Sequence, residues 1–164
     1  MTLELPEGPF KAYLFDCDGT IADSMPLHYV AWRRALGEWG CAFPEDIFYA
    51  WGGLPAAEII AKLGAQQGLA LPVDEVAERK ESLYYELLPQ LRAVPEVLEQ
   101  IQLGHGKIPF AVVSGSTRES VTRSLEVLPL NWAPWSCSSL GIFGWRGVPL
   151  KSMCSSRCAI PVSP

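Results

Sequence analysis

The segment Phe15-Asp16-Cys17-Asp18-Gly19-Thr20 follows directly on the apolar run Ala12-Tyr13-Leu14. This order predicts a buried strand over residues 10–16 that stops at two carboxylates, followed by a sharp turn at the glycine. In an extended backbone, residues i and i+2 leave on the same face, so Asp16 and Asp18 can address one small site. Two neighbouring anions repel each other, and a hard cation such as Mg2+ suits oxygen ligands of this kind.

A second short strand is predicted over residues 109–113, where the chain is continuously apolar. Ser114-Gly115-Ser116 follows it, and a helix is expected to run from there to about Leu128, with Ser116 and Glu119 at the spacing of a capping box. Ligands bind beyond the carboxyl ends of parallel strands, so this loop and the two aspartates should meet at one edge of the sheet.

The residue types at this edge favour phosphate chemistry. A hydroxyl, exposed backbone N–H groups and a helix N-terminus are suited to binding an anion, phosphate especially. A carboxylate nucleophile beside such a loop predicts phosphoryl transfer through an aspartyl-phosphate. A second carboxylate within reach can protonate the leaving oxygen and later activate water.

The segment between the two predicted strands is helical in pattern and too long for a single crossover. Apolar spacing predicts helices over residues 26–39, 55–63, 72–88 and 96–103. The residues expected on the buried face of the first helix are Leu27, Val30, Ala31, Leu36 and Trp39. The order of elements indicates an α/β fold, with a Rossmann-like parallel sheet built from residues 1–21 and 93–128 and an inserted helical cap over 22–92.

Composition excludes several functional classes. The chain has 164 residues, of which 49% are hydrophobic and 19% charged, and its net charge of −5 argues against a nucleic-acid partner bound through a basic face. No run of 18 or more apolar residues is present, so we expect no membrane span. The N-terminus lacks the basic and apolar regions of a signal peptide, and five irregularly spaced cysteines do not form a disulfide pattern. We therefore expect a cytoplasmic monomer that acts on a small molecule.

The composition changes abruptly near residue 128. All 18 acidic residues lie at or before Glu126, and residues 129–164 are rich in serine, proline and tryptophan. Residues 140–145 and 159–162 are short apolar pieces that could pair as strands. Cys154 and Cys158 lack a second ligand pair, which argues against a zinc site. The change predicts a truncation followed by unrelated sequence, as a shifted reading frame would produce.

Two motifs resemble those of the haloacid dehalogenase-like hydrolase superfamily. Asp16-Cys17-Asp18-Gly19-Thr20 is similar to the first motif of its phosphatase and phosphomutase branch, and Ser114 after an apolar strand is similar to the second. Within the helical insertion, residues 26–32 and 78–80 resemble cap segments of β-phosphoglucomutase-like proteins and bacterial fructose-1-phosphatases. The resemblance covers about residues 10–128.

The resemblance implies a role for each matching residue. Asp16 would be the nucleophile and a Mg2+ ligand, and Asp18 the general acid and base, with its backbone carbonyl on the metal. Ser114 would bind the transferring phosphoryl group, helped by the backbone of Gly115 and Ser116. The cap would contribute the substrate contacts His28 and Lys80.

The chain also departs from the family pattern. The family uses a third-motif lysine and a later acidic motif that completes the Mg2+ site. No acidic residue follows Glu126, and Lys151, the only lysine after Lys107, lies in surroundings that do not resemble the motif.

Simpler interpretations compete at several of these positions. Asp-x-Asp opens a calcium-binding EF-hand loop, but the sixth position here is Ile21 instead of glycine and the twelfth is Leu27 instead of glutamate. Residues 114–116 are alternatively a plain turn with a helix cap. His28 is alternatively an ordinary helix histidine, and Lys80 a member of a solvated charge run.

The sequence therefore predicts a Mg2+-dependent phosphohydrolase that acts on a small sugar phosphate. A β-phosphoglucomutase-like phosphomutase would share the same site residues. The absence of a basic residue from the cap loop at 52–56 favours the phosphatase. A non-enzymatic alternative is an inactive relative that binds phosphorylated ligands weakly.

Overall fold

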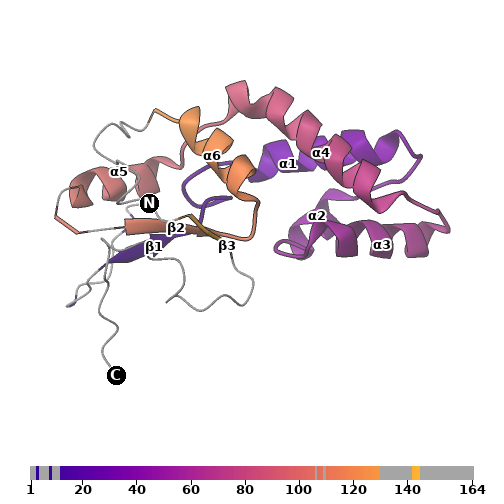
Figure 1. The fold of residues 1–164 in the computed structure, drawn as a ribbon, viewed down its shortest axis with the longest axis horizontal. Helices are drawn as coiled ribbons and strands as arrows, with labels where there is room; N and C mark the ends of the chain where they lie inside the picture. Colours follow the sequence, from indigo (N-terminus) through magenta and orange to yellow (C-terminus); the bar gives the residue numbers. More distant parts are fainter. Residues whose placement is uncertain are drawn as a thin grey trace. The chain divides into compact units, whose positions relative to one another are not determined.

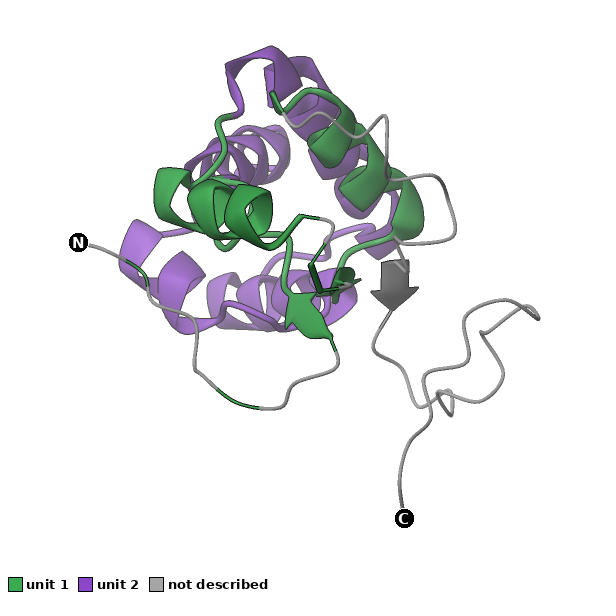
Figure 2. Ribbon diagram, turned by 90° about the vertical axis from the view of Figure 1, so that its left-hand side faces the viewer, with its two compact units in different colours: residues 1–23, 92–164 green, residues 24–91 purple. Residues whose placement is uncertain are grey.

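The computed structural model describes residues 3, 8, 12–105, 107–108, 110–129 and 142–144. These residues form three strands, six α-helices and one 3-10 helix (Figure 1). The chain divides into two compact units, one made of residues 1–23 and 92–164 and the other of residues 24–91 (Figure 2). The first contains the sheet, and the second is helical.

A parallel sheet forms the centre of the first unit. Strands β1 (Tyr13–Phe15), β2 (Phe110–Ser114) and β3 (Ile142–Gly144) are hydrogen-bonded in the order β1-β2-β3, and both pairs are parallel. In register, Phe15 lies opposite Val112, and Ser114 lies opposite Gly144. The α/β fold with a Rossmann-like parallel sheet is thus confirmed.

The strands differ slightly from their predicted bounds. Within the described residues β1 covers only 13–15, and β2 is shifted by one residue so that Ser114 is its last member. Strand β3 lies within the apolar piece at 140–145, while the piece at 159–162, Lys151, and the Cys154 and Cys158 pair lie outside the described residues.

One face of the sheet is packed and the other is partly open. Phe15 and Phe110 are buried and meet edge to face, with ring centroids 5.9 Å apart. On the opposite face Leu14 is 63% exposed. Helices α5 (Pro95–Gly104) and α6 (Arg118–Glu126) complete the described part of this unit, and α6 packs against β3 as the crossover from β2.

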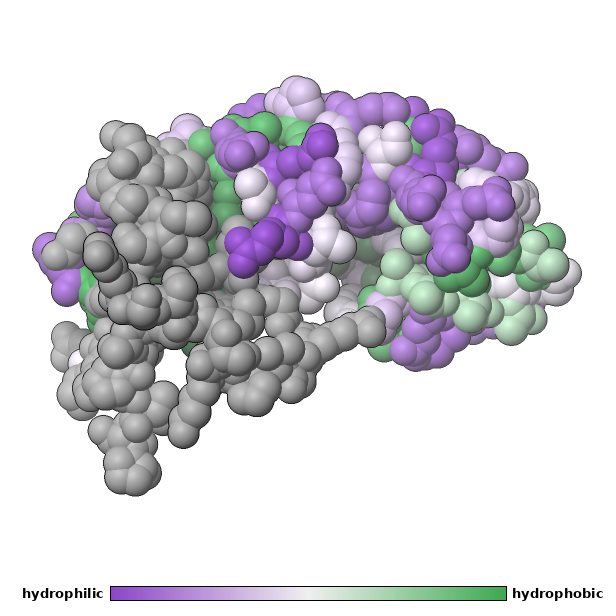
Figure 3. Space-filling view, viewed as in Figure 1, coloured by the Kyte–Doolittle hydropathy of each residue, from purple (hydrophilic) through white to green (hydrophobic). Residues whose placement is uncertain are grey.

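The second unit is built from α1 (Met25–Gly37), α2 (Glu45–Ala50), α3 (Ala56–Gln67), α4 (Val73–Leu87) and the 3-10 helix η1 (Leu88–Gln90). Helix α4 packs against both α1 and α3. The core residues of the unit are Trp32, Leu36, Cys41, Phe43, Phe48, Ile59, Ile60, Leu63 and Val76. Figure 3 shows mostly hydrophilic residues on the outer surface of α4, as its charged sequence predicts. Whether this unit serves as a cap stays a prediction.

Three predictions about helices were wrong in detail. In α1, Val30 is 40% exposed, and the buried residues are His28, Ala31, Trp32, Ala35 and Leu36. Helix α2 was not predicted because six residues are too few for a periodic signal; its Phe48 is anchored by aromatic contacts with Phe43 and Tyr29. Helix α6 begins at Arg118 with Thr117 as its N-cap, one residue later than the predicted cap at Ser116.

Candidate active site

A tight loop after β1 carries the two aspartates. The N–H of Ala22 donates to the carbonyl of Cys17 at 2.9 Å, and that of Gly19 donates to the carbonyl of Ala22 at 2.8 Å. Gly19 has φ +74°, a left-handed conformation that a residue with a Cβ adopts only with strain. The N–H of Val94 holds the far end of the loop through the carbonyl of Ile21, at 2.9 Å. The turn thus fixes the backbone that presents Asp16 and Asp18.

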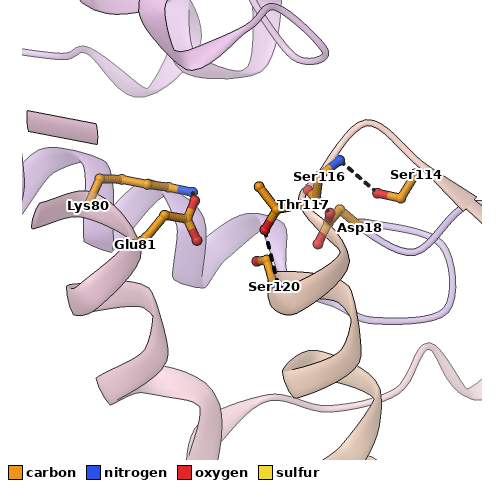
Figure 4. A network of polar contacts seen from close by, with 7 residues as sticks. All are labelled: Asp18, Lys80, Glu81, Ser114, Ser116, Thr117 and Ser120. Atoms are coloured by element: carbon orange, nitrogen blue, oxygen red, sulfur yellow. Dashed lines mark hydrogen bonds and ion pairs between the residues drawn. The ribbon is translucent and has the colours of Figure 1, made fainter. Parts of the chain in front are cut away.

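The loop after β2 reaches the loop after β1. The hydroxyl of Ser116 donates to Oδ2 of Asp18 at 2.6 Å, and the backbone N–H of Ser116 donates to Oγ of Ser114 at 3.1 Å (Figure 4). Ser114 is buried, with 4% of its surface exposed. Because β1 and β2 are parallel neighbours, their carboxyl ends bring the aspartates and serines to one edge of the sheet, as the strand order predicted.

The predicted capping box is wrong. Thr117 caps helix α6, because its Oγ1 accepts a hydrogen bond from the N–H of Ser120 at 3.2 Å. The hydroxyl of Ser116 is engaged with Asp18 instead, and Glu119 forms an ion pair with Arg123 at 2.9 Å. A side chain one residue nearer the helix therefore supplies the cap and leaves Ser116 available to the site.

The electrostatics of the loop centre on Asp16. Its side chain is largely exposed, and Oδ1 accepts a hydrogen bond from the N–H of Cys17 at 2.7 Å. Partial burial and repulsion by Asp18 raise its pKa above the ordinary 3.8, whereas the bond from Cys17 opposes that rise. Cys17 is fully buried, and burial together with both carboxylates raises the pKa of its thiol far above the usual range, which confirms its predicted role in core packing.

The helical unit holds His28 and Lys80 in a cluster of aromatic and charged groups. The ring of His28 stacks on Tyr84 with centroids 3.9 Å apart. Nζ of Lys80 lies 5.5 Å from the ring centroid of Tyr84 and 5.7 Å from that of Trp32. It also pairs with Oε1 of Glu81 at 2.7 Å (Figure 4).

The alternative of a solvated Lys80 is wrong, because only 7% of the residue is exposed. Sequence reasoning missed its partners. The i, i+4 spacing of Lys80 and Tyr84 was a signal that could have found one of them, whereas Trp32 lies on another helix and gives no local signal. The role of His28 and Lys80 as substrate contacts stays a prediction.

A metal site is not complete within the residues described. Asp16 and Asp18 offer carboxylate oxygens, but no group of three or more histidine, cysteine, aspartate or glutamate side chains able to hold a metal is found in the described ranges. Nor does any helix in this part of the chain have the length and hydropathy needed to cross a membrane.

The fold and the site together define a class of α/β proteins. In this class, the loops at the carboxyl ends of neighbouring parallel strands lie at one edge of the sheet, where ligands bind. The chain belongs to the haloacid dehalogenase-like hydrolase family, whose sequence model matches residues 13–133.

Two phosphatases are among the similar proteins. The fructose-1-phosphate phosphatase YqaB of Escherichia coli is 32% identical over 108 residues, which cover 65% of this chain and 57% of that protein. A phosphorylated carbohydrates phosphatase of Thermotoga maritima is 30% identical over 117 residues, which cover 69% of this chain and 54% of that protein. The chain thus spans little more than half the length of these curated relatives.

Solved structures share the fold. A hydrolase from Pseudomonas syringae matches with a TM-score of 0.68 at 19% identity, over 82% of this chain and 61% of the other. CbbY from Rhodobacter sphaeroides, solved in complex with phosphate, matches with a TM-score of 0.63 at 21% identity, over 72% of this chain and 56% of the other. The family and fold inferred from the two motifs are therefore confirmed.

Proposed function

We propose that the protein is a Mg2+-dependent phosphohydrolase that acts on a small sugar phosphate through an aspartyl-phosphate on Asp16. The observation that carries this proposal is the 2.6 Å hydrogen bond between Ser116 and Asp18, which joins the carboxylate loop to the proposed phosphate loop. The named activities of the E. coli and T. maritima phosphatases support the substrate class.

The first half of the reaction transfers the phosphoryl group to the protein. A carboxylate oxygen of Asp16 attacks phosphorus, and the bond from phosphorus to the sugar oxygen breaks with its electron pair on that oxygen. Asp18 gives its proton to the departing oxygen, so a neutral alcohol leaves and Asp18 becomes a carboxylate. Ser114 and the backbone of Gly115 and Ser116 hold the phosphoryl oxygens.

The second half returns Asp16 to its starting state. Asp18, now a carboxylate, accepts a proton from water as the water oxygen bonds to phosphorus. The bond between Asp16 and phosphorus breaks with its electrons on the carboxylate, and inorganic phosphate leaves. Asp18 ends protonated, ready for the next substrate, so one carboxyl group serves as acid and then as base.

The donors present suit a hard divalent cation. The mutual repulsion of Asp16 and Asp18 is relieved by a positive ion, and oxygen ligands are those that Mg2+ prefers. We propose that the Asp16 carboxylate and the Asp18 backbone carbonyl hold it. When bound, Mg2+ would neutralise charge on the phosphate and on the nucleophile.

Further features of the proposal follow from the helical unit and from composition. His28 and Lys80 would contact the substrate from a helical cap, where the positive charge of Lys80 suits a phosphorylated ligand.

The net charge of −5 supports a small-molecule substrate in place of a nucleic acid. We also propose a monomer that works in the cytoplasm without a membrane partner.

Two alternatives make different predictions. A phosphomutase would pass the phosphoryl group from Asp16 to a second sugar hydroxyl instead of water. The turn between α2 and α3, where Gly53 has φ +88°, has no basic side chain among residues 52–56 to hold a second phosphate, and this favours hydrolysis. An inactive relative would bind phosphorylated sugars without releasing phosphate.

The test is phosphate release from a panel of sugar phosphates by the full chain, in Mg2+ and in excess EDTA. We expect release only with Mg2+ and its loss in Asp16→Asn. Asp74→Asn on the exposed side of α4 is the matched control and should retain wild-type release. Full activity of Asp16→Asn would refute the nucleophile assignment, and bound sugar phosphate with no turnover by the wild type would establish the inactive alternative.

A further inference from the structure

Ser116 makes two hydrogen bonds with different groups. Its backbone N–H donates to Ser114, whereas its hydroxyl donates to Oδ2 of Asp18 at 2.6 Å. We infer that the hydroxyl of Ser116 is a positioning group for Asp18: through Oδ2 it fixes the orientation of the carboxyl group that gives and accepts the proton in the proposed reaction. This inference rests on the proposed function, and it assigns the Ser116 side chain a task apart from phosphate binding.

The loop is well built for positioning, because the backbone of Ser116 is held on both sides. Buried Ser114 at the end of β2 receives its N–H, and the following residue, Thr117, caps α6. Because this backbone is already fixed, the Ser116 side chain loses little conformational entropy when it binds Asp18. The partners are 98 residues apart in the chain, so the contact also fixes one strand end to the other.

The distance is that of a close hydrogen bond. Bonds between a hydroxyl and an oxygen acceptor are usually about 2.5–3.0 Å long, and 2.6 Å lies at the short end of that range. A bond this short restrains rotation of the Asp18 carboxyl about its Cβ–Cγ bond. The hydroxyl can therefore hold the acid in the orientation that proton transfer to the leaving oxygen needs.

A purely structural role makes a different prediction. If Ser116 only ties two loops together, its removal should slow all substrates alike. If it positions the acid, the loss should be large only where the leaving oxygen needs a proton. The sugar of fructose 1-phosphate departs as a strongly basic alkoxide unless its oxygen is protonated, whereas the p-nitrophenolate released from p-nitrophenyl phosphate is a good leaving group without a proton.

The experiment compares kcat/KM for these two probes, since this ratio covers only the steps up to departure of the leaving group. For Ser116→Ala we expect a decrease of about 10- to 100-fold with fructose 1-phosphate, part of the roughly 100- to 10,000-fold that a general acid contributes. With p-nitrophenyl phosphate the decrease should stay below about threefold, on the order of a single weak contact. Ser116→Thr keeps the hydroxyl and should restore most of the loss.

Thr117→Ala is the matched control. It weakens the cap of α6 beside the same loop but leaves the hydroxyl of Ser116 in place, so any effect should be equal for both probes. An equal decrease with both probes in Ser116→Ala, or no rescue by threonine, would overturn the positioning role. A wild type that hydrolyses neither probe would instead overturn the proposed function on which the role rests.

Discussion

Gly64 in helix α3 offers a test in which packing opposes helix propensity. Alanine normally stabilises a helix interior by up to about 1 kcal/mol relative to glycine. At position 64, however, a Cβ would lie 2.8 Å from the carbonyl oxygen of Leu69 and 3.6 Å from two side-chain carbons of Leu71. The chain folds back over the helix end here, since Gly68 has φ +67° and the N–H of Leu69 donates to the carbonyl of Gly64 at 2.9 Å.

The magnitude follows from these contacts. The close neighbour of the new Cβ is a backbone atom, which cannot move away as the tip of a side chain can, so segment 69–71 must shift. Overpacking of this kind costs about 1–3 kcal/mol, and the weakened Leu69 hydrogen bond adds about 0.5–1.5 kcal/mol. Against a propensity gain of about 1 kcal/mol, Gly64→Ala should lower the free energy of unfolding by about 1–3 kcal/mol.

The assay is urea unfolding of the full chain, followed by circular dichroism at the helix minimum. Gly37→Ala is the control, because it also replaces a helical glycine but nothing lies within 4 Å of its new Cβ. That variant should be as stable as the wild type or up to about 1 kcal/mol more stable. If Gly64→Ala matched Gly37→Ala, the predicted close approach of Leu69 over α3 would be refuted.

Three other predictions test separate parts of the structure. Asp16→Asn should raise the melting temperature in EDTA at neutral pH. Because the pKa of Asp16 is raised in the folded state, the wild type loses stability as pH rises through the range above 3.8. The higher melting temperature of the variant should therefore vanish below pH 3.8, where Asp16 of the wild type is protonated. A melting advantage that did not change with pH would contradict this cause. Ile60→Ala, at a fully buried position, should cost about 2–5 kcal/mol by urea unfolding, and a cost below about 1 kcal/mol would mean that the helical core is not packed there. Arg79→Ala should leave the urea midpoint within experimental error of the wild type, because its 2.8 Å pair with Glu38 is solvent-exposed, and a clear fall of the midpoint would contradict this.

The strands and most of the helices were predictable because their signals are local. An apolar run before Asp16 and another before Ser114 are short enough to be strands, and the apolar spacing at 72–88 matches α4 to within one residue at each end. Helix α2 was not predictable in this way, because its packing depends on Phe43, which lies outside the helix.

Some side chains could not be assigned from spacing because distant groups compete for them. Ser116 and Thr117 are both acceptable helix caps by residue type. In the structure Thr117 is the cap, and the hydroxyl of Ser116 binds Asp18 from the loop after β1. Lys80 lies in a charge run that favours exposure, yet Trp32 from α1 and Tyr84 one turn further along α4 cover it.

The sequence by itself determined the family and the chemical character of the site, because two aspartates directly after one strand and a serine at the end of another are local patterns. Only the tertiary structure decided which groups lie together. Parallel pairing of β1 with β2 aligns two strand ends that are nearly a hundred residues apart in the chain. The contact between Ser116 and Asp18 arises from that alignment, since no local pattern records which hydroxyl a carboxylate will meet across a sheet.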